Sequence, residues 1–340
     1  MSLQVLWFVL WGLLWAVYFA LDGFDLGAGM LYGTLGRSEA EKAAIRRSIG
    51  PVWDGNEVWL LTAGGATFAA FPAAYALLFS SLYLPLLVIL FALIFRGAAL
   101  EFRGKGEGSA WGRTWDAVLG AASFVPALLF GVAFGNIFRG LPINASGYRG
   151  SLVSLLNPYS LLTGVLFVLL FALHGALWIA LKTSGELGAR ALRTAAGLWS
   201  YLLIAAAGFL VSSYFSTGLA KNYLEGPAWI AVPLLAVGAL FATRIMIGRA
   251  NAAGAFLASG ATILLVTAAG LVGLYPNLLP SRLYSAFGLT IFNASSSPVT
   301  LKIMTVVALV FVPVVMAYQA WVYRVFRHKI DAGADGEAGY

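Results

Sequence analysis

Long apolar runs, each bounded by a short polar segment, repeat along the whole chain. A helix needs about 20 apolar residues to cross the roughly 30 Å of hydrocarbon in a bilayer, and these runs have about that length. The pattern therefore predicts an all-α polytopic membrane protein with nine transmembrane helices. The spans are expected at 4–33, 53–71, 73–95, 115–138, 160–181, 196–219, 228–246, 252–275 and 299–323.

The second and third spans share one apolar stretch, which we divide at Phe71-Pro72 because proline bends or ends a helix. We expect the nine helices to form two four-helix bundles plus one peripheral helix. Two loop segments, 139–159 and 276–298, are rich in Asn, Ser, Pro and Gly, which predicts folded loops. The polar ending "DAGADGEAGY" predicts disorder. The expected units are 1–138 (first four-helix unit, with the intramembrane acids), 139–275 (second four-helix unit), 276–323 (outer loop and ninth helix) and 324–340 (cytoplasmic tail).

Basic residues are distributed unequally between the two sets of loops. Of the 21 Lys and Arg residues, 16 fall in one set together with the C-terminal tail, and the other set holds five: Arg139, Arg149, Lys221, Arg282 and Lys302. Loops with excess Lys and Arg lie on the cytoplasmic side. This distribution predicts a multi-pass protein with its N-terminus outside and its C-terminus in the cytoplasm.

The composition excludes several classes of protein. Hydrophobic residues make up 61% of the chain and charged residues only 10%, with a mean hydropathy of +0.87, which no soluble domain of 340 residues could bury. The net charge of +7 reports topology in such a chain rather than binding to nucleic acid. The absence of cysteine from the sequence excludes disulfides and thiolate metal sites.

Four acidic residues fall inside or at the edge of predicted spans: Asp22 and Asp25 in the first, Asp54 and Glu57 at the start of the second. An ionised side chain facing lipid costs at least about 2.5–3.5 kcal/mol. The spacing i, i+3 puts both carboxylates of each pair on one helix face, and the predicted topology brings both pairs toward the cytoplasmic side. Partly desolvated carboxylates in a series can take up and release protons near neutral pH. The pattern predicts a cytoplasmic proton pathway.

Structural uses of these acids remain open on the residues alone. Asp54 followed by Glu57 has the spacing of a capping box, with Asp at the N-cap and Glu at N3, so for Glu57 both capping and proton handling are open. Asp22 and Asp25 could pair with Arg96 or with a basic residue of another chain. The polar residues that could support a pathway are Asn56, Arg96, Glu101 and His174.

The chain contains two histidines, of which only His174 lies within a predicted span. A lone intramembrane histidine can hydrogen-bond a neighbouring helix, relay a proton or ligate haem. We expect packing or hydrogen bonding first, proton relay next and metal ligation last. A haem held between two histidines is excluded because His328 lies in the tail, and we expect no metal site in this chain.

Two long motifs identify a family. "ALDGFDLGAGML" (20–31) and "PVWDGNEVWLLTAGGATFAAFPAAYA" (51–76) resemble subunit II of the cytochrome bd-type quinol oxidases, with support from "FRGAALEFRGK" (95–105), "GVAFGNIFRG" (131–140), "LLNPYSLLTG" (155–164) and "TSGEL" (183–187). The resemblance covers most of the chain.

This resemblance implies a subunit of a complex that oxidises quinol and reduces O2 to water, taking its protons from the cytoplasm. Its partner would be a subunit I that binds two b-type haems and one d-type haem, joined in some members by a small single-helix accessory subunit. Quinol is the substrate, and a structural quinone or lipid in this subunit is a further expectation. The acid of the W-D-G-N motif maps onto Asp54 and those of D-G-F-D onto Asp22 and Asp25. Some members carry Gln where this chain has Glu57.

Three functions were weighed on the sequence. The first is a required subunit of the quinol oxidase that supplies a proton pathway while the haems lie in the partner. The second is a proton-coupled secondary transporter, which the near absence of intramembrane charge from the second half of the chain disfavours. The third is a purely structural scaffold for subunit I.

Overall fold

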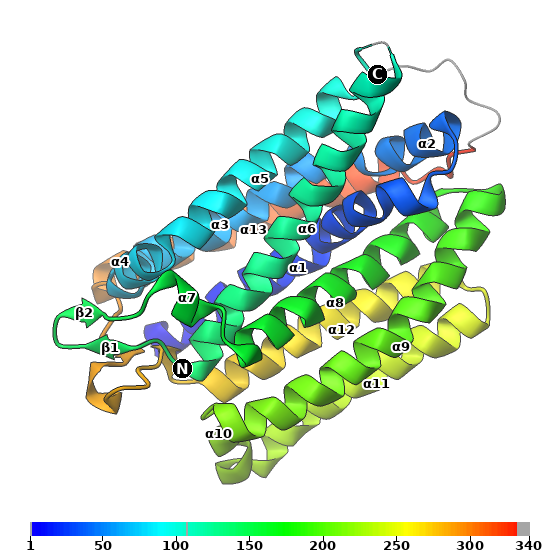
Figure 1. Cartoon of the computed structure of the whole chain (residues 1–340). Coiled ribbons are helices and arrows are strands. Elements are labelled where there is room, and N and C mark those ends of the chain that lie inside the picture. The colour runs from blue at the N-terminus through cyan, green and yellow to red at the C-terminus, as the bar shows by residue number, and fades with distance from the viewer. Residues whose placement is uncertain (1, 107, 332–340) are drawn as a thin grey trace.

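The structure, a computed structural model, describes residues 2–106 and 108–331, and most of them lie in long helices that run along one another (Figure 1). The tail expected to be disordered lies outside the described residues, apart from Asp331. The elements are α1 (Leu3–Leu35), α2 (Glu39–Ile49), α3 (Trp53–Ala70), α4 (Pro72–Ser81), α5 (Tyr83–Phe102), α6 (Ser109–Arg139), β1 (Ile143–Asn144), β2 (Gly147–Tyr148), α7 (Leu152–Leu155), α8 (Pro158–Lys182), α9 (Gly185–Ser216), α10 (Ala220–Glu225), η1 (Pro227–Ile230), α11 (Ala231–Gly248), α12 (Ala252–Leu274), β3 (Asn277–Leu279), η2 (Ser285–Phe287), β4 (Leu289–Thr290) and α13 (Pro298–Val325).

Eight helical segments among the described residues are long and apolar enough to cross a membrane: α1, α5, α6, α8, α9, η1 with α11, α12 and α13. Each overlaps a predicted span. The predicted span 53–71 corresponds to α3, which is helical over 18 residues but is not one of the eight. Its first two turns contain Asp54, Asn56 and Glu57, which lower its hydropathy. The all-helical membrane class is confirmed, and the count of nine spans stays a prediction.

The apolar stretch from 53 to 102 is broken twice. The break between Ala70 and Pro72 is the predicted one and is confirmed. A second break at Leu82 divides the expected span 73–95 between α4 and α5, so the prediction of one continuous helix there is wrong. Pro85 explains this break, because its nitrogen has no hydrogen to donate to the carbonyl of Ser81 and its ring clashes with that carbonyl.

Helix α8 lies at the centre of the bundle, packed against α1, α6, α9 and α12; 78% of its most apolar stretch is buried. At its crossing with α1, a Cβ added to Gly175 would lie 2.3 Å from the backbone nitrogen of Ala28. At its crossing with α6, a Cβ added to Gly131 would lie 2.6 Å from the Cα of Gly164. Glycine thus lets the backbones of α1 and α6 approach α8 closely.

Helix α13 packs along the outside of α1 and α3, and only 6% of its most apolar stretch is buried. Near its start, the indole N–H of Trp7 donates to the carbonyl of Leu301 at 3.1 Å. Beyond its end, the Lys182 ammonium donates to the carbonyls of Phe326 and His328. The backbone of Ile330 also hydrogen-bonds to the turn between α8 and α9. The helix is therefore fixed at both ends although most of its surface is open.

The two ends of the bundle differ in structure. Helices α1 and α13 run in the same direction, so the start of α1 and the end of α13 lie at opposite ends (Figure 1). Short hairpins made by β1 and β2 and by β3 and β4 lie at the end where α1 starts, where the N–H of Leu141 donates to the carbonyl of Pro280 at 2.9 Å. The folded loops expected at 139–159 and 276–298 are confirmed.

At the opposite end, the short helix α2 lies beside the end of α1 (Figure 1). The carboxylate of Glu41 in α2 forms an ion pair with Arg190 of α9 at 2.6 Å. The same guanidinium donates to the carbonyl of Leu35, the last residue of α1. Arg190 therefore caps α1 and holds α2 in place, which suits a cation at the negative end of a helix dipole.

Candidate functional site

The acids of α1 are buried within the chain rather than facing outward. Asp22 is 0% exposed and Asp25 is 1% exposed. They lie within one turn of each other, close to the crossing of α1 with α8, and face α3 and α5 through the contacts described below. Because a buried ionised group needs a partner, the neighbouring residues decide what these carboxylates can do.

Arg96 of α5 is the positive charge of the cluster. Its guanidinium, 1% exposed, lies 2.7 Å from an oxygen of Asp22 and 2.7 Å from an oxygen of Glu57. The contact with Glu57 is a hydrogen bond, whereas the contact with Asp22 is an ion pair that lacks the geometry of a hydrogen bond. One buried cation thus joins a fully buried acid to one whose side chain is 25% exposed.

Asn56 of α3 joins the second buried acid to α13. Its side-chain NH2 donates to the carboxylate of Asp25 at 2.7 Å. Its carbonyl oxygen accepts from the Gln319 amide at 2.9 Å and from the Tyr323 hydroxyl at 2.7 Å. The amide oxygen of Gln319 in turn accepts from the indole N–H of Trp59 at 2.7 Å. Asn56 therefore stands at the meeting point of α1, α3 and α13.

Several buried polar atoms of this cluster have no hydrogen-bond partner among the described residues. They are the Tyr18 hydroxyl oxygen, both oxygens of Asp22, one oxygen of Asp25, and Nε and Nη1 of Arg96. Unsatisfied polar atoms in a buried site are costly for stability. Their concentration around two carboxylates makes this cluster the candidate functional site of the chain.

The structure separates Asp54 from the buried cluster. Asp54 is exposed and lies in the first turn of α3. The N-cap of α3 is Val52, and no side chain caps the helix. The alternative of a capping box made by Asp54 and Glu57 is therefore wrong: the helix begins two residues earlier than that spacing requires. Both carboxylates are left without a capping role.

Two of the supporting candidates lie outside the cluster. The Glu101 side chain is 61% exposed and pairs only loosely with Lys105, at 3.9 Å. His174 of α8 is buried, with one ring nitrogen hydrogen-bonded to the Ser259 hydroxyl at 2.6 Å and the other to the carbonyl of Ala20 at 3.0 Å. Its ring stacks on Phe256 with centroids 4.4 Å apart. These contacts agree with the expected packing and hydrogen bonding; the role of His174 stays a prediction.

Sequence reasoning missed four members of the cluster: Tyr18, Trp59, Gln319 and Tyr323. A signal for the last two was present, since Gln319 is a polar residue inside an apolar span and Tyr323 follows it at i+4, on the same helix face. Tyr18 lies four residues before Asp22 on α1 in the same way. Trp59 gave no signal, because the chain has 11 tryptophans and most of them occur in apolar runs.

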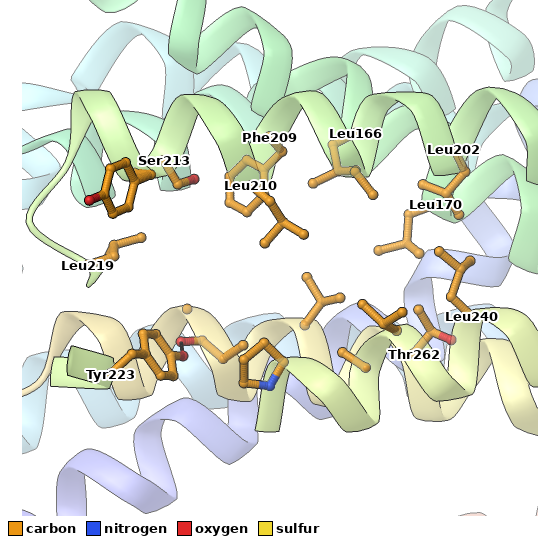
Figure 2. Close-up of a pocket in the computed structure, with 18 of the residues that line it drawn as sticks. Leu166, Leu170, Leu202, Phe209, Leu210, Ser213, Leu219, Tyr223, Leu240 and Thr262 are labelled. Atoms are coloured by element: carbon orange, nitrogen blue, oxygen red, sulfur yellow. Dashed lines mark hydrogen bonds between the residues drawn. The ribbon is translucent and has the colours of Figure 1, made fainter. Parts of the chain in front are cut away.

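A second feature is an apolar cavity of about 250 Å³ between α8, α9, α11 and α12, closed at one end by α10. Figure 2 shows Leu166, Leu202, Phe209 and Leu240 pointing into it from facing helices. Three of its polar wall groups are engaged in hydrogen bonds within the chain. Ser213 bonds Tyr159 at 2.9 Å, Tyr223 donates to the carbonyl of Ala269, and Thr262 donates to the carbonyl of Ala258. The cavity therefore suits a hydrocarbon chain rather than a polar molecule.

Among the described residues, no group of three or more His, Cys, Asp or Glu side chains could hold a metal ion. His174, the histidine of the spans, uses both ring nitrogens in hydrogen bonds within the chain. His174 therefore does not fit the role of a haem ligand, which needs a ring nitrogen free to bind iron.

Comparison with known proteins gives one consistent result. The family model described as cytochrome bd terminal oxidase subunit II matches residues 3–326. The chain is 38% identical over 331 residues to cytochrome bd ubiquinol oxidase subunit 2 of Bacillus subtilis (strain 168), covering 97% of both chains. It is 36% identical over 355 residues to cytochrome bd-I ubiquinol oxidase subunit 2 of Escherichia coli (strain K12), covering 94% of this chain and 93% of that one. In fold it is similar to a chain in the structure of the bd oxidase from Geobacillus thermodenitrificans, with a TM-score of 0.77 at 20% identity, over 96% of this chain and 99% of that chain.

Proposed function

We propose that the buried acids of this chain deliver protons to the reaction of a quinol oxidase complex. The chain belongs to the family of cytochrome bd terminal oxidase subunit II and is thus part of such a complex of aerobic respiration. Reduction of O2 to water consumes one proton for every electron that quinol supplies. A proton path across the hydrocarbon must consist of groups that exchange protons and are shielded from lipid. Support comes from the α1 acids, Asp22 and Asp25, which are carboxyl groups and are buried inside the protein.

The observation that carries the proposal is the graded exposure of four acids, two of which, Glu57 and Asp22, are linked through Arg96. Asp54 is exposed, the Glu57 side chain is 25% exposed, and Asp22 and Asp25 are buried. Glu57 and Asp22 contact the same guanidinium, so the two carboxylates flank Arg96 closely. Arginine stays charged at all working pH values. We therefore assign Arg96 the role of counter-charge, and the acids the role of exchanging protons.

The sidedness of the path follows from the basic loops. We propose that α3 is the ninth pass, with the N-terminus outside and the end of α13 in the cytoplasm of a bacterial cell. In support, α3 packs along α1, and the loops at the α2 end hold most of the Lys and Arg residues. Asp54 lies where α3 starts, so the path would open to the cytoplasm. The buried acids would extend it inward.

We propose that the b-type and d-type haems of the complex are bound by subunit I, the partner of this chain, where quinol is also oxidised. The poor fit of His174 to haem supports this assignment. This chain would contribute no ligand to the iron and would act on the reaction through protons and through contact with the partner.

The test is neutralisation of the acids in the co-expressed complex. We expect Asp25→Asn and Asp54→Asn each to lower turnover by at least about tenfold, since a positioned proton-exchanging group contributes on the order of 100-fold or more, while the haem spectrum stays native. The control is Glu186→Gln, an exposed acid paired with Arg193 on α9, which should leave turnover unchanged. Native turnover in both Asp variants with intact haem would leave the chain a scaffold for subunit I.

We also propose that the cavity between α8, α9, α11 and α12 holds the tail of a structural quinone or lipid. Its apolar walls and engaged polar groups support this, as does its position among membrane-spanning helices. Mass spectrometry of the purified complex should find a bound chain. The variant Ala206→Phe, which fills the cavity, should release it without loss of haem; an unchanged lipid content would remove this proposal.

A further inference from the structure

The hydrogen bonds around Asn56 run in one direction only. An indole nitrogen can donate but cannot accept, so the contact between Trp59 and Gln319 requires the amide oxygen of Gln319 to face the indole. The NH2 group of Gln319 must then face away, toward Asn56. It lies 2.9 Å from the Asn56 oxygen. Trp59 thus fixes the orientation of the Gln319 amide.

The same reasoning fixes the next amide. The Asn56 oxygen accepts from the Gln319 amide and from the Tyr323 hydroxyl at 2.7 Å, which together occupy its two lone pairs. Its NH2 group is therefore directed at Asp25, 2.7 Å away, and toward the carbonyl of Leu21 at 3.4 Å. If the amide were turned over, its NH2 would meet the NH2 of Gln319 and its oxygen would meet the Asp25 carboxylate; the Tyr323 hydroxyl alone could adapt, by accepting instead of donating. The arrangement admits one orientation.

We propose that Trp59, Gln319 and Tyr323 are positioning residues that hold the Asn56 amide with its NH2 toward Asp25, and so set the rate at which this carboxyl group hands on its proton. The inference rests on the proposed function of Asp25 in proton delivery. An N–H directed at a carboxylate favours the ionised form, and hydrogen bonds to charged groups are the strong ones. A turned amide would present oxygen and retain the proton on Asp25 instead. In this proposal the side-chain amides of Asn56 and Gln319 orient Asp25 and do not themselves relay the transferred proton.

This assigns a purpose to α13. Most of its apolar surface is open, yet its two inward polar residues complete a site on α1 and α3. Both residues lie at its end near Ile330, where the backbone bonds to the α8–α9 turn hold the helix against the bundle. The last helix would act on the proton step only through Asn56.

The experiment uses the assembled, haem-loaded oxidase carrying Trp59→Phe, Gln319→Met or Tyr323→Phe. Turnover is measured per haem, together with the KM for quinol. We expect Gln319→Met and Trp59→Phe to lower kcat by about tenfold with KM unchanged, because an Asn56 amide that is no longer held loses its hydrogen bond to the charged Asp25 carboxylate. Tyr323→Phe should lower kcat less, because Gln319 still holds the amide. The matched control is Trp11→Phe, which removes a buried indole hydrogen bond outside the cluster. There the Trp11 N–H on α1 donates to the Thr67 hydroxyl on α3 at 2.8 Å. This variant should keep native kcat.

Combined variants separate positioning from packing. Because Trp59 acts through Gln319, Trp59→Phe should cause no further loss in the Gln319→Met background. Neither change should lower kcat further when Asp25 is already Asn. Losses that multiply in these combinations, or a Trp59→Phe variant no slower than Trp11→Phe, would overturn the inference.

Failure of the proposed function is recognised separately. Native turnover in Asp25→Asn removes Asp25 from the proton path and the positioning role with it. A slow Asp25→Asn variant together with native kcat in all three positioning variants overturns the positioning role alone. If Gln319→Met fails to assemble with haem, the milder Trp59→Phe and Tyr323→Phe variants decide the question.

Discussion

Replacing Arg96 by methionine would test whether charge holds the buried cluster together. Arg96 is 1% exposed and lies 2.7 Å from both Asp22 and Glu57. With an effective dielectric constant near 20, each contact represents about 6 kcal/mol of Coulomb attraction before desolvation is counted. Because the cost of burying the charges cancels part of this, the loss on removing one partner of a buried pair is about 3–5 kcal/mol. We expect that loss in the free energy of unfolding of Arg96→Met.

The physical reason can be separated from simple loss of packing by neutralising the partner. Asp22→Asn alone should cost about 1–3 kcal/mol, since Arg96 keeps its bond to Glu57. In the Arg96→Met background, Asp22→Asn removes the buried charge that lost its partner, so the double variant should be more stable than Arg96→Met alone. Glu57 is partly exposed and can reach water. The two changes should therefore be strongly coupled.

The assay is unfolding of the purified, co-expressed complex in increasing SDS, followed by tryptophan fluorescence. Arg193→Met is the matched control, because its ion pair with Glu186 is exposed on both sides (65% and 66%) and should be worth less than about 1 kcal/mol. Equal stability of Arg96→Met and Arg193→Met would refute the reasoning. So would a double variant that loses the full sum of the single changes.

Two further predictions concern other parts of the fold. Gly175→Ala places a Cβ 2.3 Å from the backbone of α1, whereas a Cβ at Gly33 of α1 meets nothing within 4 Å. Gly175→Ala should therefore lose at least about 1–3 kcal/mol of stability and much of the assembled, haem-containing complex, while the control Gly33→Ala should lose neither. Equal yields of the two variants would contradict close backbone contact at this crossing. Burial alone would raise the pKa of Glu41, but hydrogen bonds from Arg190 and from the backbone N–H of Arg37 outweigh it and hold the pKa below its ordinary value of 4.5. Since the pKa of Glu41 is lower in the folded state, its stabilisation is fully present above pH 4.5 and is lost as the pH falls through the folded-state pKa. In thermal melting, the stability difference between the native protein and Glu41→Gln should be constant from pH 7 to pH 5 and shrink at lower pH. A difference that grows on acidification would contradict this prediction.

Hydrophobic patterning was sufficient to predict the fold class and the location of the helices, because burial in lipid leaves few alternatives to a helix. It failed where a local backbone effect decided the outcome. The break at Leu82 depends on Pro85, whose effect is one turn upstream of the proline itself. The predicted span from 53 matches the start of α3 at Trp53, whereas the capping-box spacing of Asp54 and Glu57 would have placed the start two residues later.

The candidate site could be predicted in part for a similar reason. Charged residues in apolar runs are conspicuous, so Asp22, Asp25, Glu57 and Arg96 were found from sequence. Gln319 was overlooked although it is polar, because its partner Asn56 lies 263 residues away and no local pattern links them. Pairings over such a distance depend on how the helices pack, which short-range periodicity does not contain.

That separation also has a consequence in time. Asn56 leaves the ribosome when most of the chain is still to be made, and its two partners on α13 follow 263 and 267 residues later. At about 5–20 residues per second, the interval is on the order of 13–50 s. Throughout this interval the Asn56 amide lacks its two α13 partners, and a chain that terminates early never gains the hydrogen bonds from Gln319 and Tyr323. The order of synthesis thus makes completion of the polypeptide a condition for a finished acid cluster.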